Sequence, residues 1–425
     1  MQTNTADLES FVDGSLDSPF PIYNLPYGVF RHEQHQFPRI GTAIGSYLLD
    51  LTLLENEGLL TKEPHKYCFN QDSLNTFASL GPELWASMRR RIQSLLSKDN
   101  HELQSNLILL KMALIPQDKV KMLSPFKIGG FSDFYASEHH ATNVGRLFRP
   151  SDAPLLPNWK YLPVGYNGRP STVFPSGTKI NRPCGLIKSP NQEAPVFSPT
   201  KKLDFELEMG LFVGVGNPEG HRISVEKAQS HLFGVVLLND WSARDIQAFE
   251  YQPLGPFLSK SFATSISPWV VTMEALQPFF VPITEQVPQP VSYLQQKHPK
   301  QLDIQLTVEL QAKGSSERKT LCQTNCKELY WSMEQLLAHH TVNNCIMRPG
   351  DLLGTGTISG ANKENWGSLL ELSFNGTQPI KLTDGSERAF LEDGDSIIFT
   401  GFCQGKGYKI GFGTLEGTII PGDGL

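Results

Sequence analysis

The sequence lacks long apolar runs. No stretch approaches the roughly 20 consecutive apolar residues that a bilayer-spanning helix needs. Residues 1–14 are acidic and polar, without the basic and apolar segments that a secretory signal peptide combines. We therefore expect a cytoplasmic protein that makes no membrane contact.

Basic runs are also scarce. The longest is Arg89-Arg90-Arg91, which we expect on a solvated helix face, and the formal net charge is -6. Proteins that bind nucleic acid carry a basic surplus or a basic stripe, so nucleic acid is not an expected partner. We expect the partner to be a small molecule.

Cysteine is infrequent and unpaired in the sequence. The six cysteines contain no CxxC unit, which is typical of proteins from a reducing compartment. Cys322 and Cys326 are the only close pair, and no second Cys or His pair follows them at the spacing of a zinc finger. We expect neither a disulfide framework nor a zinc site.

Three common catalytic or nucleotide-binding motifs are missing. No GxSxG nucleophile elbow occurs, which argues against a serine hydrolase of the α/β type. The glycine-rich segments 354–360 and 401–413 match neither a P-loop nor a dinucleotide fingerprint.

The 425 residues that are present predict a large globular protein with more than one domain. With 39% hydrophobic residues the chain can bury a sizeable core, and its 36 Gly and 30 Pro indicate many turns. The first 120 or so residues resemble a separate module, with strands around 41–49 and a helix with one apolar stripe. From about Lys121 short strands dominate, which predicts a mainly antiparallel β architecture. The stripe comprises Leu84, Met88, Ile92, Leu95 and Leu96.

Several elements of the second part can be placed. Residues 224–231 predict a short helix, and the apolar run 232–239 predicts a buried strand. Residues 242–245 (Ser-Ala-Arg-Asp) resemble a capping box that opens a helix. Residues 285–301, with three prolines, predict an exposed loop.

The segment 203–208 alternates strictly between apolar and acidic residues. In a strand this alternation puts Asp204, Glu206 and Glu208 on one face, with neighbouring side chains roughly 6 to 7 Å apart. One interpretation is a solvated face of a half-exposed antiparallel strand. The other is a buried face on which the two glutamates share a cation, since they would otherwise repel each other.

Two further acids extend the second interpretation. Asp240 stands where the predicted buried strand meets the predicted helix, although it could also be a helix-capping acid. Asp133 follows two glycines, although it could be an ordinary loop acid. Together, the four carboxylates suit a hard cation, Ca²⁺ or Mg²⁺. Their excess negative charge calls for cationic neighbours, and the candidates are Arg149, Arg244 and Lys260.

Segments along almost the whole chain resemble the fumarylacetoacetate hydrolase family, and in particular its fumarylacetoacetases. Glu-x-Glu at 206–208 is common to the wider superfamily, whereas Asp-Phe-Tyr at 133–135 and His-Ala-Thr-Asn-Val-Gly at 140–145 are far more specific. The remaining matching segments are 24–30, 162–166, 239–247, 348–353, 356–360 and 401–413.

The resemblance implies a fold and a reaction. The implied fold is mainly β (α+β), with a small SH3-like barrel over 1–122 and a catalytic mixed β-sandwich roll over 123–425, assembled as a homodimer. The implied reaction is metal-dependent hydrolysis of a carbon-carbon bond in 4-fumarylacetoacetate, which yields fumarate and acetoacetate. This is the last step of tyrosine and phenylalanine breakdown.

The resemblance also implies roles for individual residues. His140 would be the general base, oriented by Glu371, although a lone histidine more often bonds only to backbone groups. The neighbouring His139 is not part of the motif. Oxyanion stabilisation would come from Arg244, Gln247 and Lys260. The implied metal ligands are Asp133, Glu206, Glu208 and Asp240, with a second metal contact at Asp240, Lys260 and Thr264. The implied substrate contacts are Tyr135, Arg149, Tyr166, Gln247, Tyr251 and Thr357.

Two alternatives remain open. One is another enzyme of the superfamily, such as an acylpyruvate hydrolase, which would share the metal acids but usually lacks the long N-terminal module. The other is a non-catalytic binding module stabilised by calcium. A scaffold of that kind needs the acids, but it needs neither the base nor the oxyanion donors.

Overall fold

The computed structural model describes residues 8–61, 68–149, 153–283 and 285–422. Of the polar N-terminal segment 1–14, residues 1–7 lie outside this part. None of the helices in these four ranges is long and apolar enough to cross a membrane.

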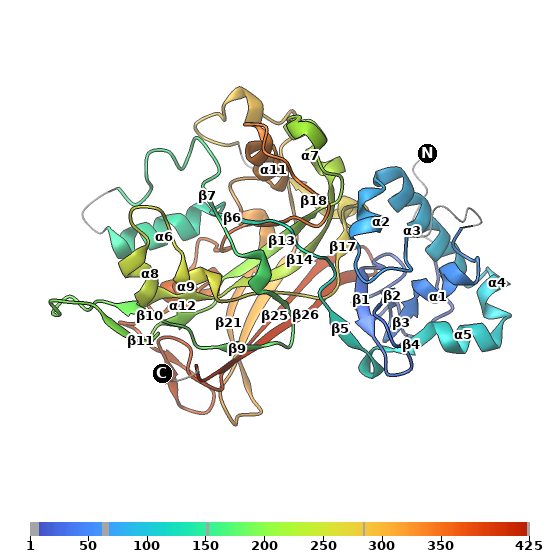
Figure 1. The fold of residues 1–425 in the computed structure, drawn as a ribbon, viewed down its shortest axis with the longest axis horizontal. Helices are drawn as coiled ribbons and strands as arrows, with labels where there is room; N and C mark the ends of the chain where they lie inside the picture. Colours follow the sequence, from blue (N-terminus) through green and yellow to red (C-terminus); the bar gives the residue numbers. More distant parts are fainter. Residues whose placement is uncertain (1–7, 62–67, 150–152, 284, 423–425) are drawn as a thin grey trace.

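The N-terminal module is built on a five-stranded antiparallel sheet, and the predicted strands around 41–49 are two of its members. Its strand order is β4-β3-β2-β1-β5. Figure 1 shows this module in blue beside the larger remainder of the chain. The strands are β1 (Tyr27–Arg31), β2 (Arg39–Ile44), β3 (Tyr47–Asp50), β4 (Leu114–Pro116) and β5 (Lys121–Leu123).

The predicted amphipathic helix is α3 (Pro82–Leu96), and Met88, Ile92, Leu95 and Leu96 are buried on its apolar side. The prediction of a solvated Arg89 is wrong, because this side chain is only 6% exposed. Its guanidinium donates to the backbone carbonyls of Asn24 at 2.6 Å and Tyr23 at 2.5 Å. The cation therefore holds the helix against the loop before β1.

Two sheets form the larger part. A mixed sheet has the order β7-β6-β22-β13-β14-β16-β8, with β17 also paired to β14, and a second has the order β21-β20-β25-β26-β9. Apolar side chains of both sheets belong to one core, including Leu237, Leu306 and Phe399. The predicted mainly β class is confirmed. The strands of the first sheet are β6 (Phe131–Phe134), β7 (Gly165–Asn167), β8 (Val173–Pro175), β13 (Leu207–Val213), β14 (Leu232–Asp240), β16 (Thr264–Ile266), β17 (Val271–Thr272) and β22 (Leu352–Gly354). Those of the second are β9 (Lys179–Asn181), β20 (Gln305–Gln311), β21 (Arg318–Asn325), β25 (Ser396–Gln404) and β26 (Lys409–Ile420).

The strand β14 confirms the prediction from the apolar run, since all its residues are buried and it ends at Asp240. The helix α7 (Val225–His231) precedes it, and α8 (Arg244–Glu250) follows. The predicted capping box is wrong, because α8 has no side-chain cap. The Ser242 hydroxyl instead donates to the Asp240 carbonyl at 3.0 Å, and the Asp245 carboxylate accepts from Lys201.

The acidic face of segment 203–208 is buried, so the solvated interpretation is wrong. Asp204 and Glu208 are 0% exposed and Glu206 is 6% exposed. The segment forms β12 (Leu203–Asp204) and the start of β13. The loop predicted over 285–301 contains a short 3-10 turn, Ser292–Leu294, and runs into a strand, Lys300–Leu302.

The two parts of the chain are joined through their backbones and their cores. Tyr27 of β1 exchanges two backbone hydrogen bonds with Val270, at 2.8 and 3.0 Å. The ring of Phe233 on β14 packs against Tyr27, Phe77 and Trp85 of the N-terminal module. The domain boundary between 122 and 123 stays a prediction.

Candidate metal centre and active site

Four buried carboxylates meet at one end of the mixed sheet. Asp133, Glu206, Glu208 and Asp240 each offer an oxygen atom, and these oxygens lie within 4.8 Å of one another. Asp133 lies on β6, Glu208 on β13, and Asp240 at the end of β14. The order of the strands in the sheet therefore brings Asp133 close to Asp240, although the two are more than 100 residues apart in the sequence.

A glycine on the intervening strand makes this meeting possible. Gly354 on β22 pairs with Asp133, and a Cβ atom at this position would lie 2.3 Å from the Asp133 carboxylate. It would also lie 3.0 Å from the Glu208 carboxylate. The backbone N–H of Gly356 donates to both acids, at 3.2 and 3.0 Å. The glycine-rich segment at 354–360 thus shapes the acid cluster.

The cluster carries excess negative charge. Burial and the nearby Asp240 carboxylate raise the pKa of Asp133 well above its usual range, and burial together with Asp133 raises that of Glu208. Glu208 Oε1 has no hydrogen-bond partner among the described residues. An all-oxygen donor set with an unpartnered carboxylate oxygen and strong mutual repulsion fits a hard divalent cation.

Lys260 compensates part of that charge. It lies on α9 (Leu258–Ser261), and its Nζ donates to Glu206 and, at 2.6 Å, to Asp240. Although burial opposes it, the two acids raise the pKa of Lys260. Asp240 also accepts from the Tyr166 hydroxyl at 2.6 Å and the Thr264 hydroxyl at 3.0 Å. Because the Lys260 ammonium donates here, its side chain is no metal ligand in this arrangement.

Arg244 is the second cation of the cluster. Its Nε donates to Asp204 at 2.8 Å, and its Nη1 contacts Glu206 at 2.8 Å and Gln247 at 3.2 Å. The predicted proximity of Arg244 and Gln247 on one helix is therefore confirmed. Burial favours the protonated form of Glu206, but Lys260 and Arg244 outweigh it and lower the pKa of Glu206 to about 2.

A histidine and a glutamate form a buried pair beside the cluster. His140 on α6 (Glu138–Phe148) and Glu371 on α12 (Leu369–Leu372) meet at 2.7 Å between Nδ1 and Oε2. Burial disfavours the carboxylate, yet His140 and the hydrogen bonds to Glu371 lower its pKa. This arrangement leaves the imidazole Nε2 as the atom able to exchange a proton with a bound molecule.

Sequence reasoning missed the residues that hold this pair in place. Glu371 also accepts from Asn143, Ser359 and Ser368, at 2.9, 2.9 and 2.8 Å. Ser368 is the N-cap of α12 with Glu371 three residues later, which is a readable Ser-x-x-Glu signal. Asn143 lies three residues after His140 on the same helix face.

Asp204 is another missed residue. Besides Arg244, its carboxylate accepts from the backbone N–H groups of Leu369 and Leu370, at 2.7 and 2.9 Å. Asp204 therefore links a cation of the acid cluster to the helix that carries Glu371. Only the alternation of 203–208 pointed toward it, and that pattern did not reveal its partners.

The predicted substrate contacts differ in how close they lie to the catalytic pair. The Tyr135 ring meets the His140 ring edge-on, with centroids 5.3 Å apart. Burial raises the pKa of Tyr135, and the charges of Glu371 and Glu206 add to this effect. Tyr251 is half-buried one turn after Gln247, at the C-terminal end of α8. The partly exposed His139 lies 3.8 Å from Glu328 instead.

Unpartnered polar atoms concentrate at this site. Nine buried side-chain N or O atoms of the described residues have no hydrogen-bond partner, and four of these belong to predicted site residues. Buried polar groups in folded proteins are normally bonded, so these atoms are available to a bound molecule or ion. The four atoms are Arg149 Nε, Glu208 Oε1, Arg244 Nη2 and Thr357 Oγ1.

Two family models cover most of the chain. The model described as "Fumarylacetoacetase N-terminal" matches residues 23–125, and that described as "Fumarylacetoacetate (FAA) hydrolase C-terminal" matches residues 130–420. The chain belongs to the fumarylacetoacetase family. It is 51% identical over 415 residues to the fumarylacetoacetase of Homo sapiens, with 97% of this chain and 99% of that protein covered.

Other fumarylacetoacetases are similar at comparable identity. Those of Dictyostelium discoideum and Arabidopsis thaliana are 49% and 48% identical, covering 98% and 97% of this chain and 99% of each relative. Among solved structures, a fumarylacetoacetate hydrolase from Exiguobacterium antarcticum superimposes with a TM-score of 0.52 at 18% identity. This comparison covers 93% of this chain and 99% of that one, and supports the fold alone.

Proposed function

We propose that this protein hydrolyses the carbon-carbon bond of 4-fumarylacetoacetate to fumarate and acetoacetate, the last step of tyrosine and phenylalanine catabolism. The observation that carries the proposal is the buried His140–Glu371 pair beside an acid cluster that also holds Arg244 and Lys260. A calcium-stabilised scaffold would need only the acids. The assignment of fumarylacetoacetate as the substrate is supported by the similarity to fumarylacetoacetases, which are 48 to 51% identical to this chain over nearly its full length.

Asp133, Glu206, Glu208 and Asp240 would hold a Ca²⁺ or Mg²⁺ ion. When bound, this ion would supply positive charge that polarises the oxygens of the diketone. A second metal contact would involve Asp240, Thr264 and the backbone of Lys260.

His140 is the proposed general base. Its Nε2 would take a proton from water, and Glu371 would hold the Nδ1 proton and stabilise the imidazolium that results. The hydroxide adds to one carbonyl carbon, the adjacent carbon-carbon bond breaks, and its electron pair leaves as the enolate of the other carbonyl. The enolate then accepts one proton, which gives the two acid products.

Arg244, Gln247 and Lys260 would stabilise the oxyanion formed by water addition. Arg244 Nη2 has no partner within the described residues and is free to donate. Lys260 would protonate or stabilise the leaving enolate. The substrate would contact Tyr135, Tyr166, Tyr251, Gln247 and Thr357, with Arg149 as the partner of a carboxylate because guanidinium matches carboxylate geometry.

Incubation of purified protein with fumarylacetoacetate tests the proposal, with loss of substrate absorbance and product identification as the readouts. We expect fumarate and acetoacetate in equal amounts. Turnover of an acylpyruvate without turnover of fumarylacetoacetate would indicate the rival superfamily enzyme. Turnover of neither substrate would favour the non-catalytic module.

A homodimer in the cytoplasm completes the proposal. All six cysteines are free, which is compatible with a reducing compartment. The hairpin of β10 (Cys184–Ile187) and β11 (Val196–Pro199) projects from the body in Figure 1 and exposes Leu186 and Phe197 by 46% and 57%. Exposed apolar side chains on a projecting hairpin suit contact with a second copy. Light scattering should give a dimer, and L186E/F197E should shift it toward a monomer.

A further inference from the structure

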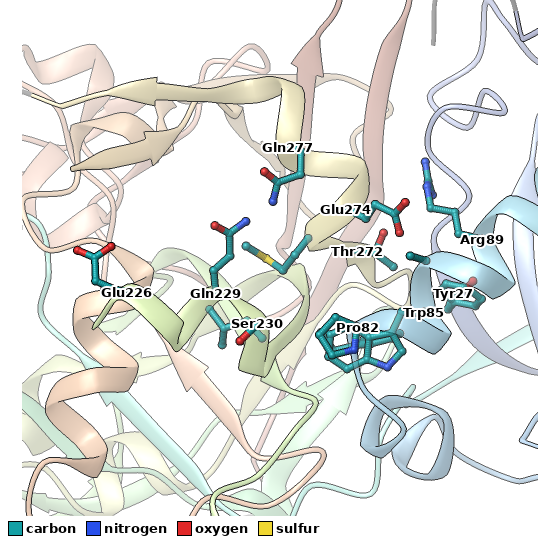
Figure 2. A pocket seen from close by; sticks show the side chains of 14 residues that line it. Tyr27, Pro82, Trp85, Arg89, Glu226, Gln229, Ser230, Thr272, Glu274 and Gln277 are labelled. Atoms are coloured by element: carbon teal, nitrogen blue, oxygen red, sulfur yellow. The ribbon is translucent and has the colours of Figure 1, made fainter. Parts of the chain in front are cut away.

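A cavity of ≈ 450 Å³ lies between the N-terminal module and the mixed sheet. In Figure 2 Tyr27, Trp85 and Arg89 come from the blue N-terminal elements, and Gln229 comes from the green helix α7 on the other side. The cavity touches the start of β14 at Phe233, whereas the acid cluster lies at its end, roughly 23 Å along a strand of this length. It is therefore separate from the candidate active site.

Two buried donors line this cavity without an acidic partner. The Tyr27 side chain is 1% exposed, and its hydroxyl has no hydrogen-bond partner among the described residues. Arg89 is 6% exposed, and its guanidinium donates to two backbone carbonyls. No carboxylate in the described part of the chain forms an ion pair with Arg89. A buried cation without an anion is costly, so an incoming anion would be stabilised here.

The two acidic residues that line the cavity are exposed, so they would repel a bound anion only weakly. Glu226 and Glu274 line the cavity but are solvent-exposed, so water and salt screen their charge. Glu274 is the acid whose charge acts most on Arg89, followed by the Tyr27 and Tyr408 hydroxyls. A ligand carboxylate between Tyr27 and Arg89 would thus meet two donors inside and only a screened repulsion outside.

Much of the remaining wall is apolar, and it includes two aromatic rings; its polar members are Gln229, Ser230, Thr272 and Gln277. Trp85 and Phe233 meet edge-on with ring centroids 5.2 Å apart, and Pro82, Leu232 and Met273 add to the apolar part of the wall. Cavities of roughly 300 to 1,000 Å³ with apolar walls and a few convergent polar groups are typical of small-molecule sites. The apolar wall favours a ring-sized hydrocarbon body over a second charged group.

We propose that this cavity binds a small monocarboxylate with an apolar, ring-sized body. The carboxylate accepts hydrogen bonds from the Tyr27 hydroxyl and the Arg89 guanidinium, and the body packs against the apolar wall that Trp85 and Phe233 form. The site is independent of the acid cluster and of the reaction proposed above.

Isothermal titration of the full chain with 3-phenylpropionate tests the proposal, with phenethylamine as a probe of similar shape and opposite charge. We expect saturable binding of the acid, and binding of the amine at least about tenfold weaker. Tyr27→Phe should weaken acid binding by about three- to tenfold, since it removes one hydrogen bond and leaves no orphan behind. Glu274→Gln should tighten it, because the variant removes a repulsive charge from an exposed position.

Ala86→Phe provides a second check, because Ala86 lines the cavity from α3 and the larger side chain would fill it. Acid binding should be lost in this variant. Four outcomes would overturn the proposal: no saturable heat with about 10 mM acid, tighter binding of the amine, unchanged affinity in Tyr27→Phe, or binding that persists in Ala86→Phe.

Discussion

At the scale of single residues, His140 is the decisive side chain. His140→Ala should lower kcat by about 10² to 10⁴-fold, the usual contribution of a general base, while the protein stays folded and its metal content stays close to the original. His139→Ala is the matched control: this neighbour is partly exposed and lies outside the pair, so the variant should keep near-normal activity. Steady-state kinetics with metal analysis would check this. A near-normal rate in His140→Ala would remove this histidine from the role of base.

The lowered pKa of Glu371 makes the stability of the fold depend on pH. Its pKa is lowered in the folded protein, so its stabilising effect is fully present above the unfolded value near 4.5 and is lost as pH falls through the folded value. The Tm difference between the original protein and Glu371→Gln should therefore be largest near neutral pH and shrink below about pH 4.5. Thermal unfolding across pH 3 to 7 measures it. A difference that grows on acidification would contradict the assignment.

Individual site residues were predictable from the sequence to different degrees. The four acids and the His140–Glu371 pair rest on motifs, and the structure places them together. Asn143, Ser359 and Asp204 were missed because each acts through a partner that is remote in sequence or through a hydrogen bond that no pattern specifies. A motif identifies the groups that react more readily than the groups that orient them.

At the scale of elements, Asp204 joins β12, which precedes the two glutamates in the chain, to the helix that carries Glu371. Asp204→Asn keeps the shape but weakens the contacts to Arg244 and to the N-terminus of α12. Since small displacements of catalytic groups are costly, kcat should fall by about 10- to 100-fold with a smaller change in KM. Kinetics at saturating substrate would check this. An unchanged kcat would show that Asp204 does not position the two groups.

The sequence predicted an element correctly where the local residue pattern determines its structure. Predictions failed where contacts with other parts of the chain determine it. The apolar run over 232–239 gave β14 because a strand buried on both faces needs no alternation. The alternation over 203–208 suggested a possible solvated face, yet both faces are covered because Arg244 and the α12 backbone lie over the acids. The supposed capping box failed because Ser242 bonds backward to Asp240 instead of forward into α8.

At the scale of the whole molecule, the two parts share one aromatic core. Phe233 of β14 packs against three rings of the N-terminal module. Phe233→Ala should therefore destabilise the protein by about 3 to 5 kcal/mol and lower the Tm of both parts together. Differential scanning calorimetry would check this. Two separate transitions, with only one affected, would contradict a shared core.

The sequence predicted two modules because an amphipathic helix is expected in the first 120 or so residues, whereas short strands dominate after them. It did not predict the shared core, since the contacts between Tyr27 and Phe233 join positions that are about 200 residues apart in the sequence. The cavity that Tyr27 and Arg89 line lies at the same junction. Because residues from both parts of the chain form it, local sequence patterns could not predict it.

Carbon-carbon bond hydrolysis by this protein should depend on a metal ion that the buried acids hold. The most direct measurement is the rate of fumarylacetoacetate hydrolysis before chelation with EDTA, after it, and after Mg²⁺ or Ca²⁺ is restored. We predict that the rate falls to background on chelation and recovers with either or both ions. An undiminished rate in protein shown to be metal-free would show that the hydrolysis does not need the metal.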